Sequence, residues 1–526
     1  MAQTLPHRLA FFHQSVLRLN CLKSGNRKIR LQKSITIGTA LTYEFKVNDL
    51  AEEFGVHRNT IRNWIKSGRL AAEKGPGKRY LLKWPDYLQL CKKYGRTPRD
   101  TVAVQQTPPD NHPLTPAPPP LLLNHPFEPI HDDPSWADSC LGCGSCGSAC
   151  PIAGIDNLDP RKIVRMAALG LNDELLGSDW PWKCTLCGRC EEHCPMTIEI
   201  VQLMRRLRAK RPRAKVPGPL HRGIETCLEK GNNLGISRED VLGLLNRTGR
   251  ELAHESCPGF AVPIDKRGAK ILMTMNSREP FAAPDHLKWW WKIFYAAGES
   301  WTLSSENWEG VNWGYFTGDD AAMKTITGRI VDNMERLGCR ALLLPEYGHA
   351  SSATRLGFER WFPEVTRKYT IYTVFDLLQK YLKEQRITVD NRRHTVLTTY
   401  HDPCHYGRLA LKTFGHGYFK EGRAITRACC PSFVEMEPGG RDNYCCGGGG
   451  GIWAMSFHPE RVFHGRIKAR QIRESGAGLV ITPCHNCHDQ LNRSLKTEFN
   501  LRIEVKYLSE LVADSIRLPA TGRKYR

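Results

Sequence analysis

Apolar residues first recur at a regular spacing in a short stretch near the N-terminus. Four of them repeat as they would on one face of a helix: Val47, Leu50, Ala51 and Phe54. Gly55 ends this helix, and a second one is predicted over residues 58–66, with Ile61 and Trp64 turned inward. Five polar residues of the second helix are left facing outward: Arg58, Asn59, Thr60, Arg62 and Asn63. With a basic turn at 74–79 between two short strands, the pattern predicts a small two-helix domain carrying a hairpin.

The remaining chain changes pattern several times. Residues 101–135 hold ten prolines, a composition typical of an extended, semi-rigid spacer. Helical spacing of apolar residues resumes after Pro160 and again over residues 195–210. Residues 260–375 alternate between strand and helix patterns, with strands at 270–277 and 341–350 around a helix near 321–337. These patterns predict a multidomain α/β chain.

Length and composition narrow the class of protein. The chain has 526 residues, of which 41% are hydrophobic, enough for several domains with sizeable cores. It contains no run of 18 or more apolar residues, so no segment is expected to span a bilayer. The first thirty residues lack the apolar stretch of a signal peptide, so we expect the protein in the cytoplasm. Twenty cysteines in a long cytoplasmic chain indicate bound metal rather than disulfides.

Positive charge is concentrated at the N-terminal end. The net charge is +21, and residues 1–100 contribute +13 of it, from 20 Lys and Arg against 7 Asp and Glu. A basic block of this kind favours an anionic partner, either nucleic acid or an acidic membrane surface. A solvated basic tail is the alternative interpretation for residues 1–35.

Two cysteine runs share the spacing C-x2-C-x2-C-x3-C-P, which binds [4Fe–4S] clusters. The first run contains Cys140, Cys143, Cys146 and Cys150, and the second contains Cys184, Cys187, Cys190 and Cys194. In such runs the fourth cysteine ligates the other cluster. We therefore expect one cluster on Cys140, Cys143, Cys146 and Cys194, and the other on Cys184, Cys187, Cys190 and Cys150. A zinc site, which would use one C-x2-C pair, is the weaker interpretation.

Five further cysteines follow a different spacing: Cys404, Cys445, Cys446, Cys484 and Cys487. The adjacent pair among them runs straight into five glycines, residues 447–451. Without side chains this backbone can close over inorganic sulfur and leave room for a bulky substrate. Five thiolates exceed the four that a standard cubane needs, which favours a noncubane or substrate-ligating cluster. A structural zinc site is the alternative, although adjacent cysteines suit a closed tetrahedral site poorly.

The N-terminal pattern resembles the excisionase and MerR type of winged helix-turn-helix. In that fold the second helix enters the major groove of DNA. The resemblance implies the fold of this segment. For its function, DNA contact and a reused docking module stand as equal alternatives, because a fold does not fix a function.

The two cysteine-rich regions resemble parts of known redox proteins. The paired runs with their helices resemble the α-helical ferredoxin module of fumarate reductase iron–sulfur subunits and heterodisulfide reductases. The order C-x40-CCG-x37-C-x2-C resembles the CCG domain of heterodisulfide reductase, whose five cysteines hold an unusual iron–sulfur cluster that acts on a disulfide. Such domains usually come in pairs. Here Tyr347 stands where a first repeat would place ligand cysteines, and no CCG follows, so we expect a degenerate first repeat.

The stretches 231–240, 291–320 and 345–350 resemble DsrK, the catalytic iron–sulfur subunit of a sulfite-reduction-linked membrane complex, and the related HdrD-type subunit of heterodisulfide reductase. The likeness spans about residues 135–515. It implies that electrons leave a quinol at a membrane cytochrome b-type subunit and pass two [4Fe–4S] clusters. They then reach a third [4Fe–4S]-type cluster that reduces a disulfide or trisulfide, either a heterodisulfide or one carried by a small DsrC-like protein. It also implies a peripheral position on the cytoplasmic face of the inner membrane.

Two other functions fit parts of the sequence. The iron–sulfur subunit of a glycolate, lactate or glycerol-3-phosphate dehydrogenase also joins two cubanes to CCG domains, but it generally has two CCG repeats and lacks the 296–314 stretch. A redox-responsive DNA-binding regulator would use the helix-turn-helix. However, two electron-transfer clusters and a third site are more than a sensor requires.

Other residues near the C-terminal cysteines carry weaker expectations. Three histidines adjoin ligand cysteines: His405, His485 and His488. They could deliver protons to leaving thiolates, but we favour a role in orienting ligands by hydrogen bonds. We expect Cys429 and Cys430 to be buried structural thiols. Because the ligand sets share no residue, we expect the ferredoxin clusters and the C-terminal cluster to be separable by mutation.

The expected domain boundaries follow from these assignments. They are a basic segment at 1–40, a helix-turn-helix at 41–97, a proline-rich linker at 98–134, a two-cluster ferredoxin domain at 135–215, a degenerate CCG-like domain at 216–395, a CCG domain at 396–516 and a tail at 517–526.

Overall fold

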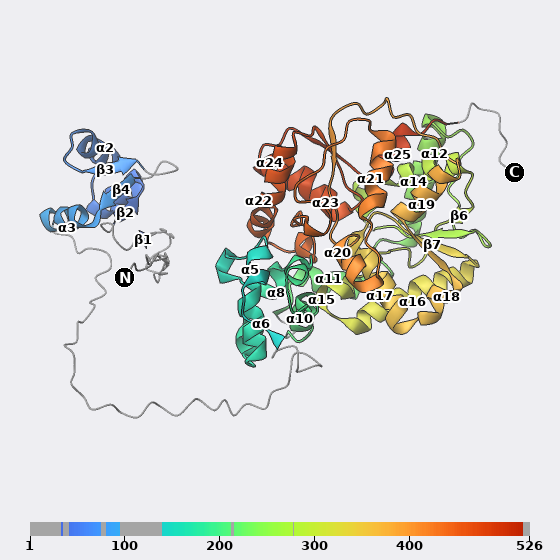
Figure 1. The fold of residues 1–526 in the computed structure, drawn as a ribbon, viewed down its shortest axis with the longest axis horizontal. Helices are drawn as coiled ribbons and strands as arrows, with labels where there is room; N and C mark the ends of the chain where they lie inside the picture. Colours follow the sequence, from blue (N-terminus) through green and yellow to red (C-terminus); the bar gives the residue numbers. More distant parts are fainter. Residues whose placement is uncertain are drawn as a thin grey trace, which may run out of the picture. The chain divides into compact units, whose positions relative to one another are not determined.

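The computed structural model describes residues 33–34, 42–74, 80–94, 139–211, 215–276 and 278–518. The predicted basic segment and proline-rich linker lie almost wholly outside the described residues. The chain divides into two compact units, Met1–Leu123 and Asn124–Arg526, and each is described by itself (Figure 1).

The N-terminal unit is built on a four-stranded antiparallel sheet in the order β1-β2-β4-β3. Its elements are β1 (Lys33–Ser34), β2 (Thr42–Phe45), α1 (Val47–Phe54), α2 (Arg58–Lys66), β3 (Ala72–Lys74), β4 (Tyr80–Lys83) and α3 (Trp84–Lys93). Leu50, Ile61 and Leu82 are completely buried in its core. Gly55 ends α1 with a φ of 65°. The predicted helices and strands are confirmed, except that Trp64 and Thr60 are half-buried.

The second unit begins with helices, and the described residues between 139 and 255 form no strand. Its helices are α5 (Ser145–Ala149), α6 (Pro160–Ala168), α7 (Asn172–Gly177), α8 (Trp180–Lys183), α9 (Arg189–Glu192), α10 (Ile200–Ala209), α11 (Gly218–Lys230) and α12 (Arg238–Glu255). The Asp159 carboxylate caps α6 by accepting from the Arg161 N–H, with Pro160 at the first helical position. The helices predicted after Pro160 and Cys194 therefore form as α6 and α10.

Two parallel sheets follow. The first has the order β6-β5-β7-β8 and the second the order β11-β10-β9. The strands are β5 (Ile271–Met273), β6 (Trp301–Thr302), β7 (Ala341–Leu344), β8 (Thr370–Thr373), β9 (Thr398–Tyr400), β10 (Leu479–Ile481) and β11 (Glu504–Lys506). Strands β5, β7 and β8 are neighbours in the same sequence as β9, β10 and β11, and all of these pairs are parallel.

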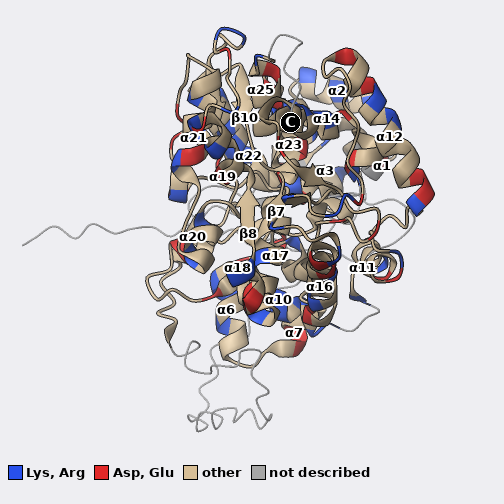
Figure 2. Ribbon diagram, turned by 90° about the vertical axis from the view of Figure 1, so that its right-hand side faces the viewer, with Lys and Arg blue, Asp and Glu red and all other residues tan. Residues whose placement is uncertain are grey.

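Helices connect these strands and cover both sheets, as expected for parallel pairing. They are α13 (Arg278–Ala282), α14 (Asp285–Ala297), α15 (Trp313–Thr317), α16 (Asp320–Leu337), α17 (Gly348–Trp361), α18 (Pro363–Lys368), α19 (Val374–Lys383), α20 (Arg408–Phe414), α21 (Phe419–Cys429), α22 (His458–Ser475), α23 (His485–Asp489), α24 (Lys496–Glu498) and α25 (Leu508–Ser515). Figure 2 shows charges of both signs on outer helices such as α12 and α16, whereas β7, β8 and β10 carry none.

One hydrophobic core spans both sheets. It includes Ile271 of β5, Leu343 of β7, Tyr400 of β9 and Ile481 of β10. Helix α25 packs against α14 and α21, so it contacts the helices of both sheets. The two sheets therefore form one continuous body around the C-terminal cysteines.

Candidate metal centres

The first expected ferredoxin ligand set lines a single pocket. The pocket wall contains Cys140, Cys143, Cys146 and Cys194. Gly142 and Gly144 have φ values of 65° and 83°, which let the backbone wrap closely around the pocket. Leu141 between the ligands is 69% exposed, and Cys143 is exposed as well. This pocket therefore has an edge that reaches the protein surface.

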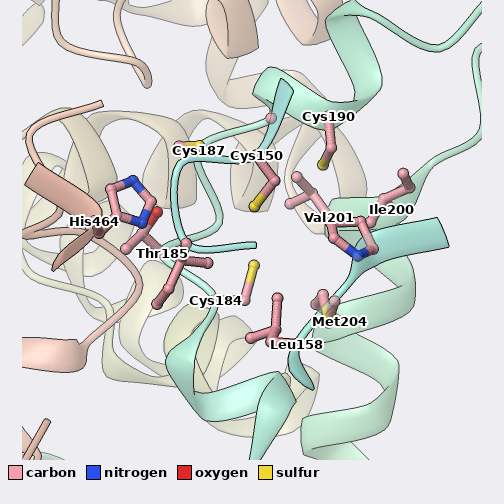
Figure 3. Close-up of a pocket in the computed structure, with 13 residues that line it drawn as sticks. Cys150, Leu158, Cys184, Thr185, Cys187, Cys190, Ile200, Val201, Met204 and His464 are labelled. Atoms are coloured by element: carbon pink, nitrogen blue, oxygen red, sulfur yellow. The ribbon is translucent and has the colours of Figure 1, made fainter. Parts of the chain in front are cut away.

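The second expected ligand set lines another pocket, shown in Figure 3. Its four cysteines are Cys150, Cys184, Cys187 and Cys190. Cys150 comes from the first run and the others from the second, so the structure brings together the exchanged set that the spacing predicts. Burial raises the pKa of the Cys184 thiol to about 11, and a bound cluster would hold that sulfur as thiolate instead.

The five C-terminal cysteines meet in the buried core of the second sheet. Cys404 follows β9, Cys484 and Cys487 follow β10, and Cys445 and Cys446 lie in the loop before α22. All five are buried, and the sulfurs of Cys446 and Cys487 lie 3.3 Å apart. Cys445 contacts both Cys404 and Cys446, and Cys484 contacts Cys487. The five thiols thus form one continuous group.

Cys187 connects the second pocket to this group. Its sulfur and that of Cys445 lie within 4.8 Å of each other. The pKa of Cys445 lies well below its usual range because Cys187 and Cys404 donate hydrogen bonds to it, while that of Cys187 is raised to about 12 by the same contact and by burial. The two expected ligand sets share no residue, but they lie next to each other at this point.

Two histidines that sequence reasoning missed face the thiols. A ring nitrogen of His464 lies within 4.8 Å of the sulfurs of Cys187 and Cys445, and one of His401 lies equally close to those of Cys446 and Cys487. His401 stands three residues before Cys404, a proximity in sequence that signals it. His464 lies in α22 with no cysteine nearby in sequence, so spacing gives no signal for it.

The three histidines singled out from the sequence make other contacts. His485 Nδ1 lies 2.7 Å from the hydroxyl of Tyr507, and His488 Nε2 lies 3.1 Å from the Val505 carbonyl oxygen. The ring of His405 packs 3.8 Å, centroid to centroid, from that of His349. Burial lowers the pKa of His485 to about 3, so this ring is neutral at physiological pH. The contacts of His485 and His488 are of the kind that orienting a ligand loop by hydrogen bonds requires, whereas neither ring nitrogen of His405 has a hydrogen-bond partner among the described residues.

The glycine run is tightly packed. A Cβ on Gly448 would lie 2.6 Å from the Asn486 carbonyl oxygen, and one on Gly449 would lie 2.7 Å from the Thr185 carbonyl oxygen. At Gly450 it would lie 2.6 Å from the Cys184 carbonyl oxygen. The N–H groups of Gly447 and Gly448 point to the sulfurs of Cys445 and Cys446 at 3.3 and 3.4 Å. The run therefore joins the cysteine loop closely to the ferredoxin backbone, and protein atoms fill the space expected for a bulky substrate.

Three buried arginines fix the ferredoxin helices against the C-terminal loop. Arg208 donates to the carbonyls of Pro181, Cys184, Phe316 and Gly450. Arg408 donates to the Cys187 carbonyl at 2.9 Å and to that of Asn443, and Arg189 also donates to Asn443. All three side chains are buried. These bonds hold the second ferredoxin pocket and the five-thiol group in a fixed relation.

Cys429 and Cys430 lie outside the thiol group. Both are completely buried in the core that spans the two sheets. Burial raises the pKa of Cys429 to about 12. Their position fits the expected structural role.

The donor chemistry of these sites fits iron–sulfur clusters. Each ferredoxin pocket gathers four thiols, the ligand number of a [4Fe–4S] cluster. At the five-thiol group, both ring nitrogens of His401 are buried without a hydrogen-bond partner among the described residues. Buried polar groups are normally paired, so atoms aimed at the sulfurs indicate a bound group that completes the site.

Known domain families match the same three regions. A 4Fe-4S dicluster domain matches residues 136–198, a cysteine-rich domain known as CCG matches residues 398–492, and a helix-turn-helix domain matches residues 44–83. These matches support [4Fe–4S] cluster binding and a mixed α/β, multidomain architecture.

Among curated proteins, the Hdr-like menaquinol oxidoreductase iron-sulfur subunit 2 of Archaeoglobus fulgidus is 24% identical over 74% of this chain and 81% of its own length. The chain resembles the heterodisulfide-reductase-like iron–sulfur subunits. The Hdr-like menaquinol oxidoreductase iron-sulfur subunit of Archaeoglobus profundus is 23% identical over the same shares of the two chains. One subunit of the fumarate reductase (CoM/CoB) of Methanothermobacter marburgensis is 25% identical, over 73% of each chain.

The resemblances inferred from the cysteine spacing and from the N-terminal helix pattern are thereby confirmed. The comparisons support an oxidoreductase subunit of the heterodisulfide-reductase-like type. Among the described residues, no helix combines the length and apolar character needed to cross a membrane.

Proposed function

We propose that this chain carries electrons through two [4Fe–4S] clusters to a third cluster in the cysteine-rich domain, where a disulfide or trisulfide is reduced. The observation that carries the proposal is the contact between Cys187 and Cys445, whose sulfurs lie within 4.8 Å. The last ligand loop of the ferredoxin module thereby meets the five-thiol group directly. The exposure of Cys143 supports an entry point for electrons at the opposite end of the proposed route.

The chain's own residues prepare the C-terminal site in three ways. The five cysteines gather in a buried environment that excludes bulk water. The Gly447 and Gly448 N–H groups direct their dipoles at the adjacent cysteine sulfurs, which favours the thiolate form. The buried arginines prevent the two ligand loops from separating. A cluster held there would supply electrons together with iron that binds sulfur.

We further propose that the first sheet belongs to a repeat that has lost its cluster. Residues 271–273 pair with 341–343, and residues 398–400 pair with 479–481, in the same parallel arrangement. Aligning these pairs puts Pro345 with Pro483, Glu346 with Cys484 and His349 with Cys487. Tyr347, which the sequence pattern put at a ligand position, aligns with His485 instead. A carboxylate and an imidazole in place of two thiolates support the loss of a cluster.

The proposed partners follow from this route. We propose a membrane cytochrome b-type subunit as the quinol-linked donor, with this chain peripheral on the cytoplasmic face of the inner membrane. A heterodisulfide, or a small DsrC-like protein carrying a disulfide or trisulfide, would be the acceptor. Support comes from the likeness to menaquinol oxidoreductase subunits.

Replacement of Cys446 tests the proposal. C446S should lower disulfide reduction by more than about 100-fold, above the roughly 10–100-fold typical of residues that only support ligands. The dithionite-reduced EPR signals of the ferredoxin clusters should persist. C430S is the matched control, because Cys430 is equally buried but lies outside the thiol group. Disulfide reduction by C446S at the wild-type rate would contradict the proposed active site.

A second candidate function, redox-responsive DNA binding, is favoured by one observation. Arg58, Asn59, Arg62 and Asn63 of α2 are all exposed, which suits a helix that enters a major groove. A gel-shift experiment with the full chain, with and without dithionite, tests this function. Any binding should weaken steeply with salt if phosphate contacts dominate. Tight, salt-insensitive and redox-dependent binding would instead favour the regulator.

A further inference from the structure

One buried histidine lies between the two neighbouring metal centres. His464 shares its surroundings with Cys187 of the ferredoxin module and Cys445 of the cysteine-rich domain, all within 4.8 Å. It also lines the second ferredoxin pocket. Figure 3 shows its ring at the edge of that pocket, on a ribbon of the C-terminal region, facing the side where Cys187 lies. The same side chain therefore belongs to both sites.

Helix α22 fixes the position of His464. Glu460 forms an ion pair with Lys183 at 3.2 Å, and Arg466 donates to the Pro151 carbonyl. The ferredoxin module thus holds α22 on either side of the histidine.

The cysteine loop packs just as closely on the same helix. A Cβ on Gly447 would lie 2.7 Å from the Arg461 carbonyl oxygen and 3.2 Å from the Cβ of His464. A Cβ on Gly465 would lie 2.7 Å from the Cys446 carbonyl oxygen. The backbone around His464 therefore has little room to move the ring away from the sulfurs.

The ring nitrogens of His464 have no other partner. Both are buried without a nitrogen or oxygen partner among the described residues, and the hydrogen-bonding contacts of the ring are with the thiols of Cys187 and Cys445. Such groups are normally satisfied. The nearby cysteine sulfurs become thiolates when they bind iron, and thiolates accept hydrogen bonds from a ring N–H.

We propose that His464 is a positioning residue that bridges Cys187 and Cys445 by hydrogen bonding and couples the second ferredoxin cluster to the cluster of the cysteine-rich domain. This inference rests on the proposed function in assuming that both sites carry clusters. Hydrogen bonds to cluster sulfurs help to set reduction potentials. Because they stabilise the more negatively charged reduced state, their loss should shift both potentials to more negative values.

An EPR-monitored redox titration of the full, reconstituted chain tests the bridge without any disulfide substrate. H464L should shift the potentials of the second ferredoxin cluster and the cysteine-rich centre, and weaken their magnetic coupling. The cluster on Cys140 should keep its potential. H464Q retains an N–H donor and should restore part of the shift. H401L is the matched comparison: His401 adjoins Cys446 and Cys487, so its loss should shift the cysteine-rich centre alone.

Several outcomes would overturn the bridge. They are wild-type potentials in H464L, a shift in H464Q as large as in H464L, or the loss of about four irons, which would make His464 a ligand. If H464L assembles no clusters, the potentials of H464Q decide the question. Potentials in H464Q close to those of the wild type support the bridge, and potentials clearly shifted from the wild type contradict it. The proposed function fails if C446S still reduces its disulfide substrate. The titration measures no disulfide reduction, so the two proposals can fail independently.

Discussion

At the residue scale, Gly450 and Gly476 offer a matched pair. Their φ values are 66° and 67°, but a Cβ on Gly450 would lie 2.6 Å from the Cys184 carbonyl oxygen, whereas nothing lies within 4 Å of one on Gly476. G476A should cost about 1–2 kcal/mol, from left-handed backbone strain alone. G450A should cost a further ~1–3 kcal/mol from overpacking. Thermal unfolding and iron content of the two variants measure the difference, and equal losses would contradict the packing role.

Glu346 makes the free energy of unfolding depend on pH. Burial raises its pKa to about 8 from an ordinary 4.5, although hydrogen bonds from the N–H and hydroxyl of Ser509 oppose the shift. Between these two values the folded state binds more protons than the unfolded state, so the titration of Glu346 lowers stability as pH rises from 4.5 through about 8. Above that pH the loss is complete.

E346Q should therefore gain melting temperature relative to the wild type as pH rises from about 5 to 8, and no further gain should follow above that range. E335Q is the control, because Glu335 is an exposed partner of Lys368. A difference between E346Q and wild type that stays constant with pH would contradict the raised pKa.

At this scale, the sequence could predict those site residues that belong to a motif of short, fixed spacing. The ferredoxin cysteines line two pockets in the sets that their spacing predicts, because the ligand rule is written in short spacings. His464 could not be found in this way, because Cys187 is remote from it in sequence and α22 carries no cysteine motif. The packing of the glycine run against Thr185 was hidden for the same reason.

At the scale of elements, the spacing of apolar residues predicted helices best where one face of the helix is buried and a glycine or proline marks one of its ends. Helices α1, α2, α6 and α16 form where the sequence predicted them, with Gly55 at the end of α1 and Pro160 at the start of α6. The turn at Gln490–Leu495 is a π-helix that directly follows the cysteine-bearing α23, and no sequence signal indicated it. Widened turns of this kind often mark functional sites, and this one lies beside Cys487, an expected cluster ligand.

The N-terminal unit should fold by itself as a fragment of residues 36–100, which leaves out the two-residue edge strand β1. Its described core is formed from its own elements and includes the fully buried Ile61. I61A should lower the free energy of unfolding by about 2–5 kcal/mol. R62A, at an exposed position of the same helix, should change it by less than about 0.5 kcal/mol. Chemical denaturation followed by circular dichroism measures both, and an unfolded wild-type fragment would contradict the prediction.

At the scale of the whole molecule, we expect the three thiol groups to set the iron content. Reconstituted protein should hold about twelve irons, four for each of three clusters, and C445S should hold about eight. Iron and sulfide analysis with Mössbauer spectroscopy measures both. Wild-type protein that saturates near eight irons, with C445S unchanged, would remove the third cluster.

The hydrogen bonds of Arg208 affect how the chain tolerates substitutions around the metal centres. The hydrogen bonds of its guanidinium go to backbone carbonyls, at Pro181, Cys184, Phe316 and Gly450. A carbonyl oxygen is present whatever side chain the residue carries. Cys184, an expected cluster ligand, and Gly450, which is tightly packed, are constrained for other reasons. Pro181 and Phe316, in contrast, can be exchanged without removing a bond. A single arginine can therefore hold three regions of the chain in place even when the residues that it contacts are substituted.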